Sequence, residues 1–260
     1  MAHEWTRPDD YDGVPRPLVS VGKDYPPSFE LATHVHGRGQ LLYAAKGAVV
    51  ITTPAGSWVA PPERAVWTPA GTPHAVRMVG EVSTRSVLLD LEASRRIGDD
   101  SMVLAVTPLL RHLLIAASEA PLLYDEAGRD GKVVALLITE LERAERVPLA
   151  TPMPADRRMA ALCQAFIERP APHDTIDAWA ARLGMDRRAF TRRFRRETGL
   201  SFGAWRQQAC VLAALPWLAE GRSVTAVALD LGYDSPAAFS TMFRRLIGVS
   251  PTRYATDKTV

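Results

Sequence analysis

Residues 223–251 read SVTAVALDLGYDSPAAFSTMFRRLIGVSP, and a similar pattern stands earlier in the chain, at residues 175–201, as TIDAWAARLGMDRRAFTRRFRRETGLS. In each stretch a short helix with internal alanines ends in Leu-Gly, and a turn follows. A residue that suits the N-cap position, Asp186 or Ser235, then opens a second helix. That helix ends at a glycine in both copies. The sequence therefore predicts a duplicated helix-turn-helix arrangement.

The second helix of each copy is predicted to be amphipathic. On a helical wheel that turns by about 100° per residue, Phe190 and Phe194 lie close together and define a buried side. The opposite face of that helix holds basic and hydroxyl side chains: Arg188, Thr191, Arg192 and Arg195. The same construction on the second copy exposes a less basic set: Ala237, Ser240, Thr241, Arg244 and Arg245. Because arginine bonds guanine bidentately and also binds phosphates, the first copy is predicted to read bases, and the second to make more phosphate and shape contacts.

Charge is unevenly distributed along the 260 residues, although the net charge is only +2. Residues 155–260 hold 16 Lys and Arg against 10 Asp and Glu, whereas residues 1–154 hold 15 against 19. The C-terminal part therefore carries a net charge of +6 and the N-terminal part a net charge of −4. A basic part with two predicted helix-turn-helix units indicates a polyanionic partner.

Residues 156–255 resemble the DNA-binding domain of AraC/XylS-type transcription regulators. The matching text is WAARLGMDRRAFTRRFRRETGLSFGAWRQQ at residues 179–208 and VTAVALDLGYDSPAAFSTMFRRLIGVSPTRY at residues 224–254. The resemblance implies two helix-turn-helix units that are joined by a long helix and enter successive major grooves of DNA. It places the base-reading positions at Arg188, Thr191, Arg192, Ala237, Ala238 and Thr241. It also implies contacts to the DNA backbone from Arg195 and Arg244.

Residues 201–221, SFGAWRQQACVLAALPWLAEG, are predicted to form the helix that connects the two units. Pro216 lies inside this stretch, where a proline removes a backbone donor and normally kinks or ends a helix. We therefore expect the connecting helix either to bend at Pro216 or to begin its last turn anew there.

The N-terminal part reads as a strand-rich block that follows a proline-rich arm of about 28 residues, with a short strand at LVSV. Short segments rich in Val, Ile, Trp and Tyr are separated by Gly and Pro, which suits a β-sandwich or a small barrel. These segments are QLLYAAKG, AVVITTPAG, SWVAPP, RAVWTPAG, HAVRMVG and STRSVLLDLE.

Two helical segments and a linker follow the strands. Residues 101–120 and 131–146 carry apolar side chains at helical spacing. The two predicted helices could pack on the strand block or pair with their copies in a second subunit. VPLATPMPADR, residues 147–157, has three prolines in a short span, which is typical of an interdomain linker.

HVHGRGQLLYAAKG, residues 34–47, sets two histidines one residue apart. Residues two apart in a strand point to the same face, so His34 and His36 can converge on one point. TPAGTPHAV supplies His74 after a Pro-x-Gly turn. Three imidazoles together with the amide oxygen of Gln40 could bind a divalent Zn, Ni, Mn or Fe ion.

The spacing of these residues is similar to the two motifs of the cupin barrel, His-x-His followed by Glu and Gly, and Pro-x-Gly-x-x-His. The resemblance implies a barrel with metal ligands at His34, His36, Gln40 and His74. The chain departs from the pattern at Gln40, where an acid is usual, and an amide is a neutral and weaker ligand. In the alternative interpretation the histidines only form hydrogen bonds, in a barrel that holds an organic ligand or nothing.

Four further residues of the strand block are candidates for the lining of an effector pocket, because they are aromatic or soft: Tyr43, Trp58, Trp67 and Met78. They fit a hydrophobic core equally well. Cys163 and Cys210 have no CxxC spacing and lie in apolar helical surroundings, so they are expected to be buried free thiols.

These patterns predict an α+β protein of two domains. We expect an arm and cupin-like sensing barrel at residues 1–100, a helical dimerisation segment at 101–148, a linker at 149–155 and a double helix-turn-helix domain at 156–255. No apolar run reaches the length of a membrane span and no signal-peptide pattern opens the chain, so a cytoplasmic location is expected.

The function predicted from the sequence is sequence-specific DNA binding by a transcription regulator, not an enzyme, that a small effector, a metal ion or both control through the barrel. Its expected partners are operator DNA, the effector, a second copy of the chain and, for an activator, RNA polymerase. The resemblance points to short, cupin-headed regulators of efflux or catabolic operons. Two alternatives stay open: a cupin metalloenzyme of the oxygenase or isomerase type, and a constitutive DNA-binding protein whose barrel is a scaffold.

Overall fold

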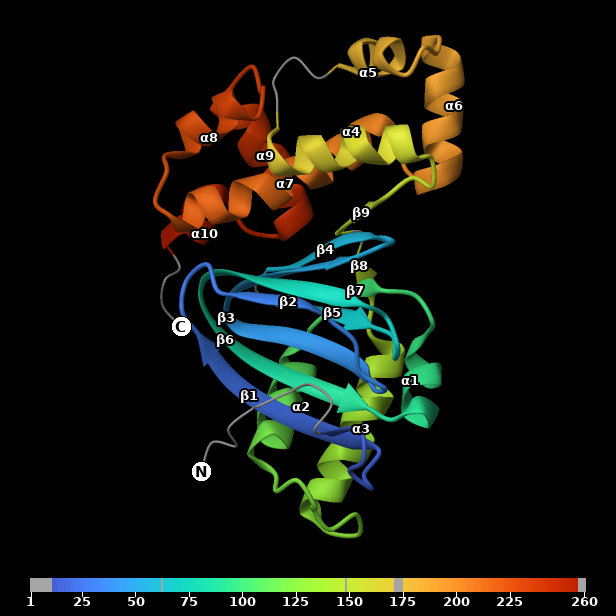
Figure 1. Ribbon diagram of the computed structural model, residues 1–260. Coiled ribbons are helices and arrows are strands. Elements are labelled where there is room, and N and C mark those ends of the chain that lie inside the picture. Colours follow the sequence, from blue (N-terminus) through green and yellow to red (C-terminus); the bar gives the residue numbers. More distant parts are fainter. Residues whose placement is uncertain (1–10, 62, 148, 171–174, 257–260) are drawn as a thin grey trace. The chain divides into compact units, whose positions relative to one another are not determined.

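The computed structural model describes residues 11–61, 63–147, 149–170 and 175–256 (Figure 1). The chain divides into two compact units. Unit 1 consists of Met1–Thr53 and Trp58–Leu149, and unit 2 consists of Pro54–Ser57 and Ala150–Val260. The first is based on an antiparallel sheet and the second on helices, so the prediction of a two-domain α+β protein is confirmed.

Unit 1 is built on antiparallel strands. In chain order these are β1 (Leu18–Tyr25), β2 (Glu30–His34), β3 (Gly39–Thr53), β4 (Gly56–Ala60), β5 (Arg64–Thr68), β6 (His74–Leu89), β7 (Met102–Ala105) and β8 (Arg146–Val147). The order across the sheet is β1-β6-β3-β5-β7-β8, and β2 also pairs with β6. Strand β1 extends the predicted LVSV strand to Tyr25, so the arm contains more regular structure than the prolines indicate. The arm is described only from residue 11 onward.

Strands β3 and β6 are each longer than predicted. The sequence indicates two separate strands on either side of Gly47 and again on either side of Gly80, but the structure has one strand of 15 residues and one of 16. The pairing of β3 with β6 shifts register between Ala44 and Ala48. Gly47 and Gly80 have φ angles of 76° and 74° and lie in this irregular region. These glycines therefore bend long strands at a bulge instead of separating short ones.

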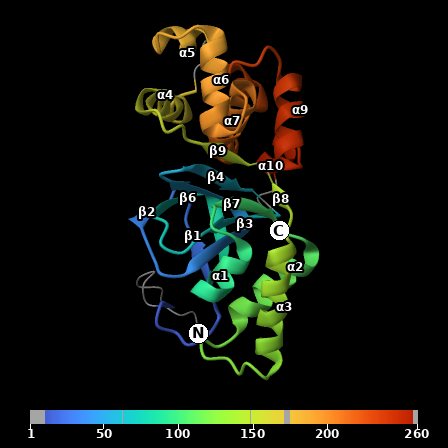
Figure 2. The ribbon, with the colours of Figure 1, turned by 90° about the vertical axis from the view of Figure 1, so that its right-hand side faces the viewer.

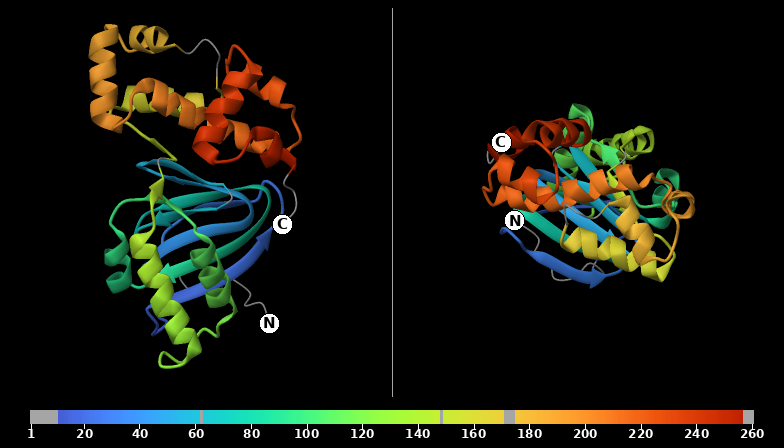
Figure 3. Two further views of the ribbon diagram at one scale, coloured as in Figure 1. Left: turned by 180° about the vertical axis from the view of Figure 1, so that it is seen from behind. Right: turned by 90° about the horizontal axis from the view of Figure 1, so that it is seen from above.

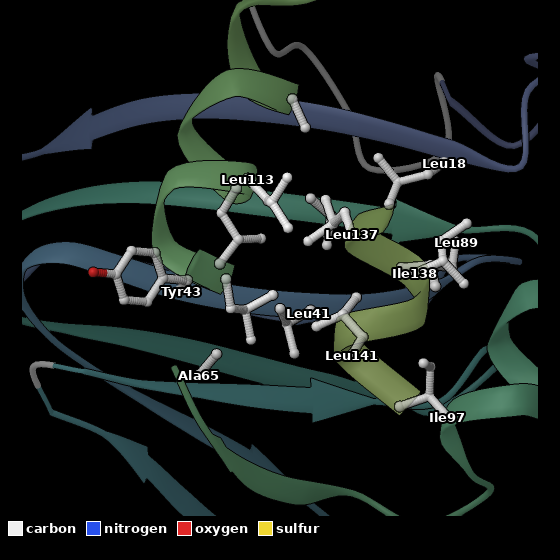
Figure 4. Close-up of a cluster of buried hydrophobic side chains, with 14 of the residues drawn as sticks. Leu18, Leu41, Tyr43, Ala65, Leu89, Ile97, Leu113, Leu137, Ile138 and Leu141 are labelled. Atoms are coloured by element: carbon white, nitrogen blue, oxygen red, sulfur yellow. The ribbon is translucent and has the colours of Figure 1, made fainter. Parts of the chain in front are cut away.

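Three helices pack on one face of the sheet: α1 (Leu91–Ile97), α2 (Pro108–Glu119) and α3 (Arg129–Arg143). Figure 3, left, shows α2 and α3 in green in front of the blue strands. Figure 4 shows Leu41 and Tyr43 of β3 pointing into the same space as Leu113 of α2 and Leu137 of α3. Of the two arrangements that the sequence left open, the apolar faces of these helices therefore use the first, packing on the strands.

The predicted helix over residues 101–120 is wrong in its first third. Residues Met102–Ala105 form β7, which pairs with β5, and the helix begins only at Pro108. Thr107 is the N-cap, and its side chain accepts a hydrogen bond from the backbone N–H of Leu110 at 3.2 Å. A short apolar run such as MVLAV fits a buried strand and a helix equally well, so periodicity alone does not separate the two.

Unit 2 contains the strand β9 (Ala150–Pro152), which lies in the predicted linker, and seven helices among the described residues. The helices are α4 (Arg157–Glu168), α5 (Ile176–Arg182), α6 (Arg187–Thr198), α7 (Phe202–Ala219), α8 (Val224–Asp230), α9 (Pro236–Ile247) and α10 (Pro251–Thr256). Helices α5 and α6 form the first helix-turn-helix unit and α8 and α9 the second. Figure 2 shows α6 and α9 running in similar directions, with α7 between them.

The two helix-turn-helix units close their turns in the same way. The backbone N–H of Met185 donates to the carbonyl of Ala180 at 2.9 Å, and that of Tyr233 donates to the carbonyl of Ala228 at 3.0 Å. The side chains of Asp186 and Ser235 cap α6 and α9, as the sequence predicts. The duplication read from the sequence is therefore a duplication of backbone structure.

Helix α7 connects the two helix-turn-helix units of unit 2. It runs without interruption through Pro216 to Ala219. The backbone N–H of Glu220 donates to the carbonyl of Pro216 at 2.9 Å, so the helical hydrogen bonding continues beyond the proline. A helix that begins anew at Pro216 is therefore not observed. The many buried residues of α7 compensate for the donor that the proline lacks, because tertiary packing supplies most of a helix's stability.

An aromatic cluster forms the centre of the first helix-turn-helix unit. Trp179 of α5 is fully buried, and its ring lies 4.9 Å from that of Phe202 and 5.8 Å from that of Trp205, between ring centroids. Phe190 and Phe194 of α6 pack against it, both with centroids at 6.5 Å. This cluster fixes which face of α6 points inward.

Cys163 and Cys210 are buried free cysteines, as predicted. None of the helices in the described part of the chain combines the length and the apolar character that crossing a membrane requires.

Candidate nucleic-acid interface and candidate metal site

Helix α6 presents a basic surface on the side away from the aromatic cluster. The residues predicted from the helical wheel are all exposed: Arg188, Thr191, Arg192 and Arg195. Arg187 and Arg196 extend the same surface. Phe190 and Phe194 are buried, so the predicted inner and outer faces of this helix are confirmed.

The arginines of α6 divide into two groups by their ion pairs. Arg187 pairs with Asp177 at 3.1 Å, Arg193 with two carboxylates, and Arg196 lies 3.7 Å from a Glu197 oxygen. The other three arginines of the helix, Arg188, Arg192 and Arg195, make no ion pair with any residue that the structure describes. Because no carboxylate of the described residues neutralises their charges, these three guanidinium groups are available to a polyanion.

Helix α9 presents a less basic surface. Ala237, Ala238 and Thr241 are exposed, and Ser240 is half-buried. Arg244 and Arg245 are exposed near the C-terminal end of the helix. Phe239 and Phe243 are buried and pack against each other, with ring centroids 5.6 Å apart.

One structural residue of α6 was missed by the sequence reasoning. Arg193 lies between Asp156 and Glu197, with nitrogen to oxygen distances of 2.6 Å and 2.8 Å. The backbone N–H of Asp156 also donates to Glu197 at 2.9 Å, and the Asp156 side chain caps α4. Arg193 therefore ties the start of α4 to α6 and holds the basic helix in place. Its i,i+4 spacing to Glu197 was the available signal.

These contacts lower the pKa of both carboxyl groups. The pKa of Asp156 is lowered first by the hydrogen bond from the Met159 backbone and then by the nearby charge of Arg193. The pKa of Glu197 is lowered first by the hydrogen bond from Arg193 and then by that from the Asp156 backbone. Both groups are therefore held in the charged form.

Polar contacts of α7 position the second helix-turn-helix unit. Arg206 donates from Nη2 to the carbonyl of Leu231, which lies in the turn before α9, at 3.1 Å. Arg245 of α9 donates to the side-chain oxygen of Gln207 at 2.6 Å. The connecting helix thus supports both the turn and the second basic helix.

In unit 1 the structure brings the three predicted histidines together. Potential ligand atoms of His34, His36 and His74 all lie within 4.8 Å of one another. His34 is at the end of β2, His36 follows in the loop, and His74 begins β6, where it pairs with His34 across the strands. His36 and His74 are 4% and 0% exposed, so the cluster is largely removed from water.

Each histidine uses Nδ1 to bond a backbone carbonyl. The acceptors are Ala32 for His34 at 2.8 Å, Arg38 for His36 at 2.6 Å and Thr72 for His74 at 2.8 Å. A carbonyl oxygen can only accept, so Nδ1 carries the proton and Nε2 of a neutral ring keeps a free lone pair. Nε2 of His34 and of His36 has no hydrogen-bond partner among the described residues. Histidines that bind metals usually bond a backbone carbonyl through one ring nitrogen in this way, which orients the other nitrogen toward the ion.

Gln40, the fourth predicted ligand, lies beside the histidines. It is 3% exposed, donates from Nε2 to the hydroxyl of Ser86 at 2.9 Å, and places Oε1 3.0 Å from Nε2 of His74. Burial lowers the pKa of His74 to about 4, so this ring is neutral at pH 7. Two acceptor atoms therefore face each other across 3.0 Å. A cation between them, or a rotation of the Gln40 amide, resolves this conflict.

The loop that holds His36 is anchored to the N-terminal segment by residues that the sequence did not single out. Asp12 accepts a hydrogen bond from the backbone N–H of Gly37 at 2.8 Å. Arg38, 4% exposed, donates to the carbonyls of Val14 and Arg16 at 2.5 Å and 3.0 Å. Only the burial of an arginine, which sequence does not display, would have indicated this role.

The predicted effector-pocket residues do not lie together. Met78 lines a cavity of about 20 Å³ together with His34 and Gln40. Tyr43 and Trp67 face the other side of the sheet and belong to the core under α1, α2 and α3. Trp58 is buried but does not line this cavity. Since alternate residues of a strand face opposite sides, Gln40 toward the cavity places Tyr43 away from it.

Two family models match most of the chain. A family model described as a helix-turn-helix domain matches residues 179–257, and one described as an AraC-like ligand-binding domain matches residues 18–141. The transcriptional regulator NimR of Escherichia coli K12 is 30% identical over 221 residues, which are 85% of this chain and 81% of NimR.

Two further proteins show more limited similarity. The regulator RipA of Corynebacterium glutamicum is 34% identical over 116 residues, which are 44% of this chain and 34% of RipA. The crystal structure of ToxT from Vibrio cholerae, with a bound unsaturated fatty acid, aligns with 92% of this chain and 94% of ToxT, at 11% identity and a TM-score of 0.38.

Proposed function

Because this chain belongs to the AraC family of transcriptional regulators, which combine a helix-turn-helix DNA-binding domain with a ligand-binding domain, we propose a division of roles between its residues. Helices α6 and α9 contact operator DNA, and the histidine cluster of unit 1 binds a divalent metal ion that controls regulation. The observation that carries the metal proposal is that one ring nitrogen from each of His34, His36 and His74 lies within 4.8 Å of the others. The chain acts as a regulator and not as an enzyme, in keeping with its relatives.

The basic surface of α6 is proposed to supply most of the direct base contacts. Arg188, Thr191 and Arg192 face the major groove, and the unpaired guanidinium groups can bond guanine O6 and N7 bidentately. Arg195 and Arg244 bind phosphates, and the remaining contacts come from Ala237, Ala238, Ser240 and Thr241. The support is that all of these side chains except the half-buried Ser240 are exposed.

The DNA proposal is tested by comparing two arginine variants. Arg192→Ala is expected to cost about 1–3 kcal/mol on the preferred operator and to relax specificity at one base pair. Arg195→Ala is expected to weaken binding to all sequences similarly and to reduce the salt dependence of the affinity. Equal losses from both variants on specific and random DNA, measured by fluorescence anisotropy over a salt series, would refute this division.

The metal proposal rests on the polar atoms that the fold leaves without partners. The rotated Gln40 amide would satisfy His74, but its two N–H groups cannot also satisfy Nε2 of both His34 and His36, which are buried without a hydrogen-bond partner among the described residues. A divalent ion of Zn, Ni, Mn or Fe accepts lone pairs from all three imidazoles and from Oε1 of Gln40. The donor set therefore fits a metal ion, and the neutral Gln40 makes the site less negative than one with a carboxylate.

The size of the cavity beside the cluster, which His34 and Gln40 line, also favours an ion over an organic effector. A volume of about 20 Å³ holds roughly one water molecule. Typical sites for organic ligands measure about 300–1,000 Å³. An organic effector would therefore have to open this cavity, whereas an ion needs only small movements of the ligands.

The effect of the ion on DNA binding is proposed to be a population shift. His34 and His36 come from a strand end and a loop, whereas Gln40 and His74 come from the long strands β3 and β6. A ligand that favours the converged arrangement shifts the regulator toward it, and the affinity for DNA changes by the same coupling free energy.

Several properties of the working regulator complete the proposal. A cupin-like character of the sheet is supported by the motif positions of His34, His36 and His74. A homodimer is proposed on the amphipathic helices α2 and α3, where Leu109 and Leu136 are 49% and 43% exposed. Operator binding assigns the regulator to the cytoplasm, and an activator would also contact RNA polymerase.

The decisive experiment for the metal is the metal content of the purified protein, by elemental mass spectrometry, in the wild type and in His34→Ala/His74→Ala. About one equivalent that the double variant loses supports the site. Wild-type protein without metal after incubation with Zn, Ni, Mn or Fe(II) refutes it, and leaves an organic effector or a scaffold role for the sheet. Substrate turnover by the metal-loaded protein would instead indicate a metalloenzyme.

A further inference from the structure

The two helix-turn-helix units differ at the positions that face DNA, although their buried positions correspond. Phe190 and Phe194 of α6 are equivalent to Phe239 and Phe243 of α9, and all four are fully buried. The same alignment pairs the exposed residues of the two helices: Arg188 with Ala237, Thr191 with Ser240, Arg192 with Thr241, Arg195 with Arg244, and Arg196 with Arg245. The basic pair near the helix end is thus retained, whereas both arginines at base-reading positions are replaced.

The replaced positions give α9 a surface of methyl groups. Ala237, Ala238 and Thr241 are exposed and form one patch at the N-terminal half of the helix. The hydroxyl of Thr241 donates to the carbonyl of Ala237 at 3.0 Å, so its hydrogen is already used within the helix. The methyl group of Thr241 takes no part in this hydrogen bond and can make an apolar contact. No guanidinium or amide group occupies these positions.

We propose that the two helices read chemically different bases: α6 reads guanines through Arg188 and Arg192, and α9 reads the C5 methyl groups of thymines through Ala237, Ala238 and Thr241. This inference rests on the proposed contact of both helices with DNA. Thymine is the only base that carries a methyl group in the major groove, and alanine and threonine methyls are its usual apolar partners. The operator accordingly has two unlike boxes, one containing guanine and one containing thymine, and is not a repeat of one sequence.

The retained arginines account for affinity without altering this selectivity. Arg244 is exposed and has no ion pair with a described residue, and Arg245 is held by Gln207. A guanidinium group on a phosphate adds salt-dependent affinity for any sequence. The sequence preference of α9 is therefore assigned to its methyl groups and not to its arginines.

The test begins with selection of duplexes from a random DNA library by the full-length chain, at one fixed salt concentration. Selection by Arg192→Ala in parallel identifies the α6 box, because its guanine preference relaxes there. Thymines in the other box are then replaced one at a time by uracil, which removes only the C5 methyl group. Loss of about threefold to fivefold in affinity per contacted methyl is expected, from the burial of one such group.

A matched pair of variants connects the methyl effect to α9. Thr241→Ser removes one methyl group and retains the hydroxyl. Its affinity for the thymine operator is expected to fall by a similar factor, whereas its affinity for the uracil operator should be close to that of the wild type. Thr139→Ser is the control, because Thr139 in α3 makes the same hydroxyl bond to a backbone carbonyl, that of Ala135, at 2.9 Å. The control variant is expected to bind like the wild type.

Three outcomes would overturn the inference. If replacement by uracil has no effect on affinity at any thymine of the second box, α9 does not read methyl groups. A loss with Thr241→Ser that is equally large on thymine and uracil operators shows that the residue acts in another way. If no sequence is enriched by the wild type at all, base reading by α6 and α9 fails as a whole, which distinguishes failure of the proposed function from failure of this inference.

Discussion

Gly47 offers a direct test of how the sheet of unit 1 is bent. Its φ angle is 76°, and a Cβ atom added there would lie 2.4 Å from the carbonyl oxygen of Glu81 and 2.9 Å from a methyl of Val82. Gly47→Ala therefore combines two unfavourable effects: a left-handed backbone conformation and a collision with the backbone of β6. The second effect cannot be relieved by a rotamer change, because the obstructing oxygen belongs to the main chain.

Gly71→Ala separates the two effects. Gly71 has nearly the same φ angle, 73°, but nothing lies within 4 Å of an added Cβ. Its substitution should cost about 1–2 kcal/mol, the penalty of the left-handed conformation. Gly47→Ala should cost that amount plus about 1–3 kcal/mol for the displaced strand, or about 2–5 kcal/mol in all. Against a total stability of about 5–15 kcal/mol, the variant should still fold.

Hydrogen exchange over a urea series, read from peptides of β3 and β6, measures this difference within unit 1. Peptides of α6 in the same samples provide an internal reference for unit 2. Gly47→Ala is expected to lower the opening free energy of β3 and β6 clearly more than Gly71→Ala does. Equal losses in the two variants would show that the close approach to Glu81 does not constrain the bulge.

Three further predictions concern unit 2. The pKa values of Asp156 and Glu197 are lowered below their ordinary 3.8 and 4.5, so these carboxylates stabilise the fold fully above those pH values and lose that contribution as the pH falls through their folded-state pKa values. The urea midpoint of unit 2 should therefore fall with acid, and it should fall less in Glu197→Gln. Burial raises the pKa of Cys163 to about 12 and that of Cys210 to about 11, so neither thiol should react with a disulfide reagent at pH 8 until urea unfolds the chain. Trp205→Phe removes a hydrogen bond to the backbone carbonyl of Pro152 and leaves a cavity where part of a fully buried indole stood, so it should cost about 2–4 kcal/mol in equilibrium unfolding.

The sequence was most informative where local chemistry alone fixes the structure. The caps of α6 and α9, their Phe-based inner faces and the intervening helix follow from short-range patterns, and all are present. Strand boundaries were predicted less well. Gly47 reads as the end of a strand because glycine favours turns, but its role as a bulge depends on the opposing residues of β6 between Val79 and Ser83, which are distant in the chain.

The same distinction applies to the histidine cluster. Motif spacing placed His34, His36, Gln40 and His74 in one predicted site, and the structure brings them together. Sequence alone does not separate pocket residues from core residues, because Tyr43, Trp67 and Met78 are equally suited to either side of a sheet. Which side becomes cavity is decided by the helices that cover the other, and this is a tertiary property.

The ligands of the proposed metal site differ in how firmly the fold holds them. Gln40 and His74 are buried residues of β3 and β6, whereas the pairing of β2 with β6 shifts register just before His34, and His36 lies in the loop beyond. The free energy of assembling the site therefore falls mainly on the segment from His34 to Gly37. Asp12 restrains that segment through the backbone N–H of Gly37, which reduces the conformational freedom lost on binding. For this reason His34→Ala/His74→Ala, which removes one ligand of each kind, tests the site more completely than a change in either group alone.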